Sequence, residues 1–359
     1  MDKSKVFFIP VENGRDRERT AYLLKILIKE SRLLEEIERN SLVAIKLTFG
    51  EKENQGYIKP QLVKVVVDKL KAKGAKPFLT DTNVIYKGKR MNAVDHLETA
   101  YLHGFTYENV RCPIFIGDGL LGENSKEIEI DKKHIKKAYI AHFLYYVDQM
   151  IVLSHFTGHL FTGFASTLKN IGMGLATRKG KLQQHSNVKP KVIEKNCRLC
   201  LLCIKVCPVQ AIERRESSSF IREELCIGCG ECLVACKFNA IEVSYSEDVN
   251  VLGEKIVEYT YAVLKGLKRK IFFNFLLQIT KECDCLAKSE PPVIPDMGIF
   301  VSLDPVAIDK AGVDMISKKV GRDIFKVLHA QSADVDRQLN YAQEMGLGSL
   351  DYQLIKIEP

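Results

Sequence analysis

The segment Asn196–Pro208 reads NCRLCLLCIKVCP and places cysteine at positions 197, 200, 203 and 207. The same spacing returns at positions 226, 229, 232 and 236, so each cysteine of the second set follows its counterpart by 29 residues. The repeat extends past the cysteines, because Ala211–Ile212 and Ala240–Ile241 stand at the same offset. A duplication without gaps predicts two copies of one small supersecondary unit.

The spacing of these cysteines is typical of ligands to iron–sulfur clusters. A [4Fe-4S] cube needs one thiolate per iron, and the fourth cysteine of each run binds the other cube in two-cluster proteins. We therefore assign Cys197, Cys200, Cys203 and Cys236 to cluster 1, and Cys226, Cys229, Cys232 and Cys207 to cluster 2. Zinc also binds pairs of cysteines separated by two residues, but the longer third gap and Pro208 favour clusters.

The composition of the chain is that of an ordinary globular protein, with 359 residues, 46% hydrophobic and 27% charged. No stretch approaches the roughly 20 apolar residues that a membrane helix needs, and the first residues lack the features of a signal peptide. We therefore expect a cytoplasmic protein, without a membrane partner, whose eleven cysteines do not form a disulfide framework.

The formal net charge of +8 comes from basic residues spread along the chain. The densest groups are Lys132, Lys133, Lys136 and Lys137; Arg178, Lys179 and Lys181; and Lys265, Lys268, Arg269 and Lys270. No nucleic-acid-binding motif accompanies them, so we do not expect a nucleic-acid partner. We interpret them as solvated surface, or as the landing site of an acidic redox carrier of the ferredoxin or flavodoxin type.

Strands and helices alternate on both sides of the cysteine segment. Apolar runs predict strands at 5–11, 42–49, 76–83, 112–118, 149–156, 270–279 and 297–303, and helical spacing predicts helices at 19–40, 59–75, 91–104, 250–267 and from 304. This order predicts an α/β fold, with a mostly parallel sheet and helices on both faces, interrupted by a small α+β domain. The expected domains are 1–187, 188–246 and 247–359, with the polar stretch 178–191 as an exposed loop where the insertion begins.

Candidate site residues follow from the ends of the predicted strands, where ligands of open α/β sheets bind. These ends carry Lys46 and Asp81 and then the segment 154–174, which contains His155, His159, Lys169 and Asn170 and a helix expected from about Gly163. Histidines four residues apart suit a metal or acid–base chemistry. The alternative is that the histidines are structural and that the glycines only form a turn.

Three further cysteines lie outside the repeat. Cys283 and Cys285 follow a predicted strand, and a Cys-x-Cys pair binds soft metals or forms a labile dithiol, so we place this pair near the same site. Cys112 we interpret as an inert core residue.

Two family resemblances rest on these motifs. Residues 191–244 resemble the bacterial two-cluster [4Fe-4S] ferredoxin module, with Lys237 where that module usually has proline. The flanks resemble the uncharacterised iron–sulfur family known as domain of unknown function 362, through VAIKLTFG, GAKPFLTDTN, HFTGHLFTGFASTLKNIGMG, CDC, PDMGIF and SLDPVAIDKA. The resemblance implies an α/β domain that carries a two-cluster ferredoxin, and it implies no particular substrate.

Two functional hypotheses remain open at this point. In the first, the chain is an oxidoreductase whose two [4Fe-4S] clusters exchange electrons between an external carrier and a small-molecule site in the α/β domain. In the second, it transfers electrons without chemistry of its own, and the α/β domain docks partner proteins. No glycine-rich dinucleotide fingerprint follows a strand, so a flavin or nicotinamide is not expected.

Overall fold

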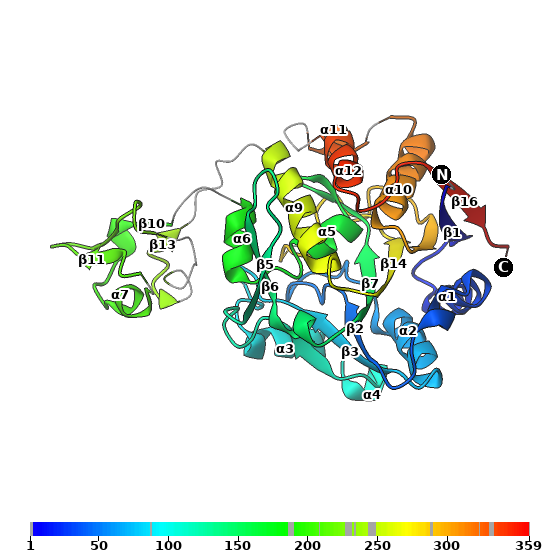
Figure 1. Ribbon diagram of the computed structural model, residues 1–359, viewed down its shortest axis with the longest axis horizontal. Coiled ribbons are helices and arrows are strands. Elements are labelled where there is room, and N and C mark those ends of the chain that lie inside the picture. Colours follow the sequence, from blue (N-terminus) through cyan, green and yellow to red (C-terminus); the bar gives the residue numbers. More distant parts are fainter. Residues whose placement is uncertain are drawn as a thin grey trace.

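The computed structural model describes residues 3–86, 88–185, 190–207, 209–226, 232, 235–242, 249–287, 290–322, 324–329 and 334–358. Figure 1 shows a large α/β domain and a small module that contains the cysteine repeat. Within the described residues, no helix is long and apolar enough to cross a membrane.

The large domain is built on an eight-stranded sheet in the order β16-β1-β15-β14-β7-β2-β3-β4. Neighbouring strands are parallel except at β15, which runs antiparallel to both β1 and β14. The strands are β1 (Ser4–Pro10), β2 (Leu42–Lys46), β3 (Lys76–Asp81), β4 (Ile114–Ile116), β7 (Gln149–His155), β14 (Arg269–Leu276), β15 (Gly298–Ser302) and β16 (Tyr352–Lys356). The prediction of a mostly parallel α/β sheet is thereby confirmed.

The central strand β7 explains why the sheet needs helices on both faces. Met150 and Val152 belong to one apolar core, and Ile151 and Leu153 belong to the other. Alternate residues of a strand point to opposite faces, so an unbroken apolar run such as this one is buried on both sides.

Each face of the sheet is covered by its own set of helices (Figure 1). One core contains side chains of α1 (Arg17–Ser31), α2 (Pro60–Ala72) and α3 (Ala93–Leu102). The other contains side chains of α5 (Thr167–Gly172), α9 (Val249–Leu264), α10 (Pro305–Val320), α11 (Ile324–Leu328) and α12 (Val335–Glu344). The remaining elements of this domain are η1 (Leu33–Glu36), α4 (Tyr107–Val110), β5 (Ser125–Glu129), β6 (Lys137–Ala141), η2 (His142–Tyr145), β8 (Thr157–His159), β9 (Gly163–Ala165) and α6 (Arg178–His185).

Some element boundaries differ from the prediction. The helix expected over 19–40 ends at Ser31, because Arg32 takes a left-handed conformation with φ of 55°. The helix expected from Gly163 begins at Thr167 instead. Gly163 has φ of 74° and lies in the hairpin of β8 and β9, a backbone shape that a right-handed helix excludes.

The stretch expected as an exposed loop at 178–191 is also different. It begins with the helix α6, in which Arg178, Lys181 and Gln184 are buried. The interpretation of Arg178 and Lys181 as solvated surface is therefore wrong. Polar residues on one face of a short helix carry no apolar signal, so their burial depends on partners elsewhere in the fold.

The cysteine module has a core of its own. Its elements are β10 (Lys191–Val192), η3 (Glu194–Asn196), α7 (Leu202–Val206), β11 (Ile212–Arg214), β12 (Ser219–Ile221) and β13 (Ile241–Glu242). Isoleucines and cysteines of both repeats pack together in it. The expected domain boundaries near 187 and 246 fall outside the described residues, so the three-part division stays a prediction. Strands from before and after the module share the large sheet.

Candidate functional site

The four cysteines assigned to cluster 1 come together around one small cavity in the module. Cys197 and Cys200 precede α7, Cys203 lies in the first turn of that helix, and Cys236 comes from the second repeat. All four line the cavity. In a pair of linked cubes, each cube takes three cysteines from one repeat and its fourth from the other, and this cavity has that composition.

Backbone N–H groups point at the fourth cysteine of each repeat. The Ala211 N–H donates to Cys207 Sγ and the Ala240 N–H donates to Cys236 Sγ, each with an N···S distance of 3.2 Å. Such hydrogen bonds stabilise negative charge on sulfur and are one of the ways in which proteins tune iron–sulfur clusters. The donor set therefore fits a cluster bound through thiolates.

Three of the cysteines assigned to cluster 2 are also described. Cys232 is part of the module's apolar core, and Cys207 and Cys226 pack against it. Cys229 lies outside the described residues. The assignment of individual ligands to the two clusters remains a prediction.

The second site lies in the large domain, at the carboxyl ends of the parallel strands. Lys46 ends β2 and Asp81 ends the neighbouring β3. Lys46 Nζ lies 3.1 Å from Asp81 Oδ1 and donates to Asn170 Oδ1 at 2.6 Å, so the ends of two strands are linked to α5. The Asn170 amide in turn donates to the Leu153 carbonyl at 2.9 Å. Lys46 and Asp81 therefore meet, as residues at adjacent strand ends are expected to do, and Asn170 joins them from α5.

Asp81 is also surrounded by groups that the sequence did not single out. Arg90 Nη1 lies 3.5 Å and His96 Nε2 3.6 Å from Asp81 Oδ2. Burial favours the neutral acid, but Lys46, His96 and Arg90 outweigh it and hold the pKa of Asp81 below its ordinary value. Arg90 is itself buried and contacts Glu51, with an Nε–Oε2 distance of 3.3 Å. This site is therefore a network of charges rather than an isolated pair.

A cavity of about 280 Å³ opens beside this network. Its apolar walls include Val84, Ile85, Met173, Leu252 and Ile256, and its polar groups include Asp81, Arg90, His159, Lys169, Asn170 and Lys181. A mostly apolar cavity with a few convergent polar groups is the usual form of a small-molecule site.

Two amino groups of this cavity, those of Lys169 and Lys181, form no ion pair within 4.0 Å among the described residues, although Asp284 acts on Lys169 and Asp118 on Lys181 from farther away. Lys181 Nζ donates to the Ala176 carbonyl at 2.5 Å and contacts the Thr82 hydroxyl. Burial lowers the pKa of Lys169 to about 8 and that of Lys181 to about 8. Both groups are charged at neutral pH and would gain from a bound anion. Lys181 was not among the site residues expected from the sequence, because a polar face on a short helix carries no signal of burial.

His155 is held by two acceptors. Its Nδ1 lies 3.0 Å from Asp284 Oδ2 and its Nε2 lies 2.7 Å from the Leu277 carbonyl oxygen. Burial acts to lower the pKa of His155, but Asp284 and the carbonyl outweigh it and raise the pKa. With both ring nitrogens donating, His155 is an imidazolium and has no lone pair to offer a metal. It acts here as a clamp between β7 and the 277–285 segment.

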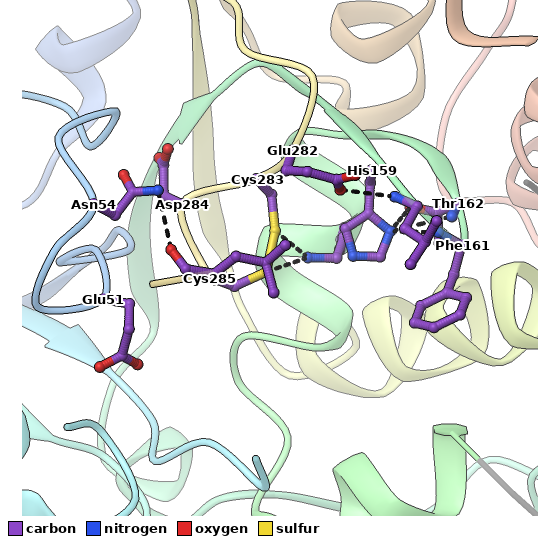
Figure 2. The surroundings of a disulfide bond; sticks show 12 residues. Glu51, Asn54, His159, Phe161, Thr162, Glu282, Cys283, Asp284 and Cys285 are labelled. Carbon is purple, nitrogen blue, oxygen red and sulfur yellow. Dashed lines mark hydrogen bonds between the residues drawn. A yellow bond between two sulfur atoms is a disulfide. The ribbon is translucent and has the colours of Figure 1, made fainter. Parts of the chain in front are cut away.

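His159 has different surroundings and lies in the β8–β9 hairpin. Its Nδ1 accepts from the Phe161 N–H at 3.2 Å and the Thr162 N–H at 3.1 Å (Figure 2), while the Thr162 hydroxyl, 2.9 Å away, donates to the Phe164 carbonyl at 2.7 Å. Burial lowers the pKa of His159 well below its ordinary value, and Lys169 adds to the effect. The ring is therefore neutral and carries its proton on Nε2. The two histidines do not share one centre.

Cys283 and Cys285 are joined by a disulfide bond (Figure 2). Lys169 Nζ lies 3.5 Å from Cys283 Sγ and 3.9 Å from Cys285 Sγ. Both cysteines line a smaller cavity that also contains His155 and Asn170. The expectation that the pair lies near the site agrees with this geometry. Cys112 is buried, and burial raises the pKa of its thiol to about 12, which suits an inert core residue.

The fold and these sites define an α/β protein that carries an inserted cysteine-rich module of the ferredoxin type. The family model described as domain of unknown function (DUF362) matches residues 43–314, which is more than half of the chain. The chain therefore belongs to the DUF362 family.

Curated relatives match over short segments, of the size of the cysteine module. The chain is 43% identical over 56 residues to hydrogenase-4 component A of Escherichia coli, 51% over 39 residues to an uncharacterised ferredoxin of Methanocaldococcus jannaschii, and 45% over 49 residues to the electron transport protein HydN of Escherichia coli. These matches cover 16%, 11% and 13% of this chain, and 27%, 24% and 28% of the relatives. The chain thus spans about a quarter of the length of each relative.

Solved structures give a weaker likeness. A Thermotoga maritima protein matches with a TM-score of 0.39 and 10% identity, over 72% of this chain and 50% of that chain. The lactate racemase apoprotein of Thermoanaerobacterium thermosaccharolyticum matches with a TM-score of 0.37 and 13% identity, over 75% of this chain and 50% of that chain.

Proposed function

We propose that this protein binds two [4Fe-4S] clusters and passes electrons between them and a small-molecule site in its α/β domain. The relatives named as electron transport proteins and ferredoxins support the cluster part of this proposal. The outside partner would be a redox carrier of the ferredoxin or flavodoxin type. When bound, the clusters would supply one-electron transfer. The residues of the chain would hold the clusters, bind the substrate and control protons.

One observation carries the cluster proposal: Cys236 of the second repeat lines the same cavity as Cys197, Cys200 and Cys203. A zinc site would need only four cysteines from two neighbouring pairs. A cysteine of the second repeat beside three of the first is instead what two linked cubes require.

The test is an inventory of iron and acid-labile sulfide in protein purified without oxygen. We expect about eight irons and about eight sulfides per chain. Cys236→Ala should reduce the iron to about four per chain, because only one cube loses a ligand. Cys112→Ala is the matched control, because Cys112 is a buried cysteine that lies far from the repeat in the sequence. This variant should leave the iron content unchanged. Zinc with little iron, or full iron in Cys236→Ala, would contradict the proposal.

The geometry favours the enzyme over a carrier without chemistry. Lys169 and Lys181 face a cavity with apolar walls and form no ion pair within the part of the chain that the structure describes. The carboxylates that act on them, Asp284 and Asp118, do so from farther away, so a bound anion would offset part of the cost of burying two ammonium groups. We therefore propose a small anionic substrate with an apolar body, bound with its anionic group at Lys169 and Lys181.

A further inference from the structure

We propose that Cys283 and Cys285 are a redox-active pair, a disulfide that takes up two electrons at the wall of the substrate cavity. The two cysteines differ in exposure, because Cys283 is buried and Cys285 is partly exposed. Both line the smaller cavity, and Cys285 also lines the larger one. A substrate in the larger cavity would thus lie next to one of the two sulfurs. The inference rests on the proposed function for the source of the electrons and for the substrate that receives them.

The charge beside the sulfurs supports a redox role. Lys169 Nζ is 3.5 Å from Cys283 Sγ and 3.9 Å from Cys285 Sγ, and Lys169 forms no ion pair among the described residues. An ammonium next to a cysteine lowers the pKa of the thiol and stabilises the thiolate. Lys169 therefore stabilises the reduced form of the pair, which carries negative charge, more than the neutral disulfide.

A metal site is the competing interpretation of the same residues. His159, Cys283 and Cys285 offer ligand atoms within 4.8 Å of one another. However, Nδ1 of His159 accepts from the backbone N–H groups of Phe161 and Thr162, so the neutral ring carries its proton on the other nitrogen and has no lone pair free. The ammonium of Lys169 would also repel a cation held by the two sulfurs. The surroundings of Cys283 and Cys285 therefore favour a redox-active disulfide over a metal site.

The backbone at Asp284 and Cys285 is held by hydrogen bonds, so the sulfurs would stay close together after reduction. The Glu51 N–H donates to the Asp284 carbonyl at 3.0 Å, and Arg90 Nη2 donates to the Cys285 carbonyl at 3.3 Å. The Asp284 side chain is clamped by His155. A reduced pair held in this way can close again to the disulfide without a large rearrangement.

The step balances as follows. Two electrons break the S–S bond and leave two sulfur anions. One proton converts one of them to a thiol, and the Lys169 ammonium neutralises the other. Two reduced iron–sulfur clusters, each a one-electron donor, would supply the electrons. Reoxidation of the pair would return two electrons and one proton to a substrate in the cavity.

The first experiment follows the pair directly, by differential alkylation of the full-length protein in dithiothreitol buffers of graded redox poise. Trypsin releases the pair on one peptide, because Lys281 and Lys288 flank it and it contains no other cysteine. We expect this peptide to convert in one transition from the disulfide to the doubly alkylated form. A peptide that is alkylated in every buffer, or that stays oxidised after full reduction of the protein, would overturn the proposal.

Variants of two lysines test the charge. Lys169→Met should slow alkylation of the reduced pair at pH 7 about tenfold, since fewer thiols are ionised, and Lys169→Arg should keep most of the rate. Lys181→Met is the matched control, because Lys181 faces the same cavity but contacts Thr82 and Ala176 instead of the sulfurs. Equal rates in Lys169→Met and Lys181→Met would refute the role of Lys169, and one stoichiometric zinc bound to the reduced pair would replace the proposal with a metal site.

A second experiment separates this inference from the proposed function. Reduced methyl viologen, a one-electron donor, is added to the cluster-loaded protein and to the Cys200→Ala/Cys226→Ala variant. Opening of the disulfide only in the cluster-loaded protein supports both proposals. Opening by dithiothreitol but not through the clusters would support the redox pair and contradict the clusters as its electron source.

Discussion

Lys46 and Asp81 form a buried ion pair across two neighbouring parallel strands, with 3.1 Å between Nζ and Oδ1 and side-chain exposures of 0% and 4%. The pair joins the end of β2 to the end of β3, and Asn170 adds α5 to it. A buried pair of this kind contributes little net stability when intact, but it is costly to break, because the remaining charge is left without a partner. The pair thus ties two strand ends and α5 together beside the larger cavity, which Asp81 and Asn170 line.

Lys46→Met should therefore destabilise the large domain by about 3 kcal/mol. The matched control is Lys64→Met, because Lys64 pairs with Asp68 on the exposed surface of α2 and such pairs contribute about 0–1 kcal/mol. Urea unfolding followed by circular dichroism measures both. Equal losses in the two variants would show that the buried pair is not special.

Features that depend on neighbouring residues in the chain could be predicted from the sequence. Continuous apolar runs predict strands such as β7 because burial on both faces leaves no room for alternation. Lys46, Asp81 and Asn170 could be grouped in advance because parallel strands end at one edge of the sheet. Arg90 and Lys181 could not, since their burial depends on contacts with Glu51 and Thr82, which are distant in sequence and follow no pattern. The charged state of His155 and the neutral state of His159 could not be predicted either, because hydrogen-bond partners rather than sequence spacing decide them.

The packing of Gly158 predicts that the 281–285 segment is sensitive to a single methyl group. A Cβ added at Gly158 would lie 2.2 Å from the carbonyl oxygen of Lys281, and this backbone leads directly to Cys283. Gly158→Ala should cost about 1–3 kcal/mol of stability, because the segment must shift. Gly266→Ala meets nothing within 4 Å and should change the free energy of unfolding by less than about 0.5 kcal/mol. The urea midpoints of the two variants test this, and a Gly158→Ala variant as stable as Gly266→Ala would contradict it.

The His155 clamp predicts a dependence on pH. Because Asp284 and the Leu277 carbonyl raise the pKa of His155, the stability that this group contributes is fully present below its unfolded value of 6.5. It is lost as the pH rises through the raised folded value. Asp284→Asn should lower the pKa of His155, measured by NMR titration of the ring, and should flatten the fall in the free energy of unfolding above neutral pH. An unchanged ring pKa in this variant would exclude the clamp.

The lowered pKa values of Lys169 and Lys181 predict how anion binding changes with pH. Since both pKa values are about 8, each group is about 90% charged at pH 7 and about 10% charged at pH 9. Inorganic phosphate, used as a simple anionic probe, should raise the melting temperature at pH 7 and much less at pH 9. Lys181→Met should reduce the shift at pH 7, whereas Lys64→Met should keep it. A phosphate effect that is equal at both pH values would contradict the assignment of the anion site.

The repeat in the module predicts opposite effects of two glycine substitutions. Gln210 and Asn239 occupy equivalent positions and both have positive φ, of 51° and 57°. Asparagine tolerates this conformation, whereas in glutamine it costs about 1 kcal/mol. Gln210→Gly should therefore stabilise the module, even though glycine has greater conformational freedom in the unfolded chain. Lys205→Gly, an exposed substitution within α7, should destabilise it by about 1 kcal/mol. We measure the temperature at which the visible absorbance of the clusters is lost. This temperature should rise in Gln210→Gly and fall in Lys205→Gly. A fall in both variants would show that the left-handed turn at Gln210 is not strained.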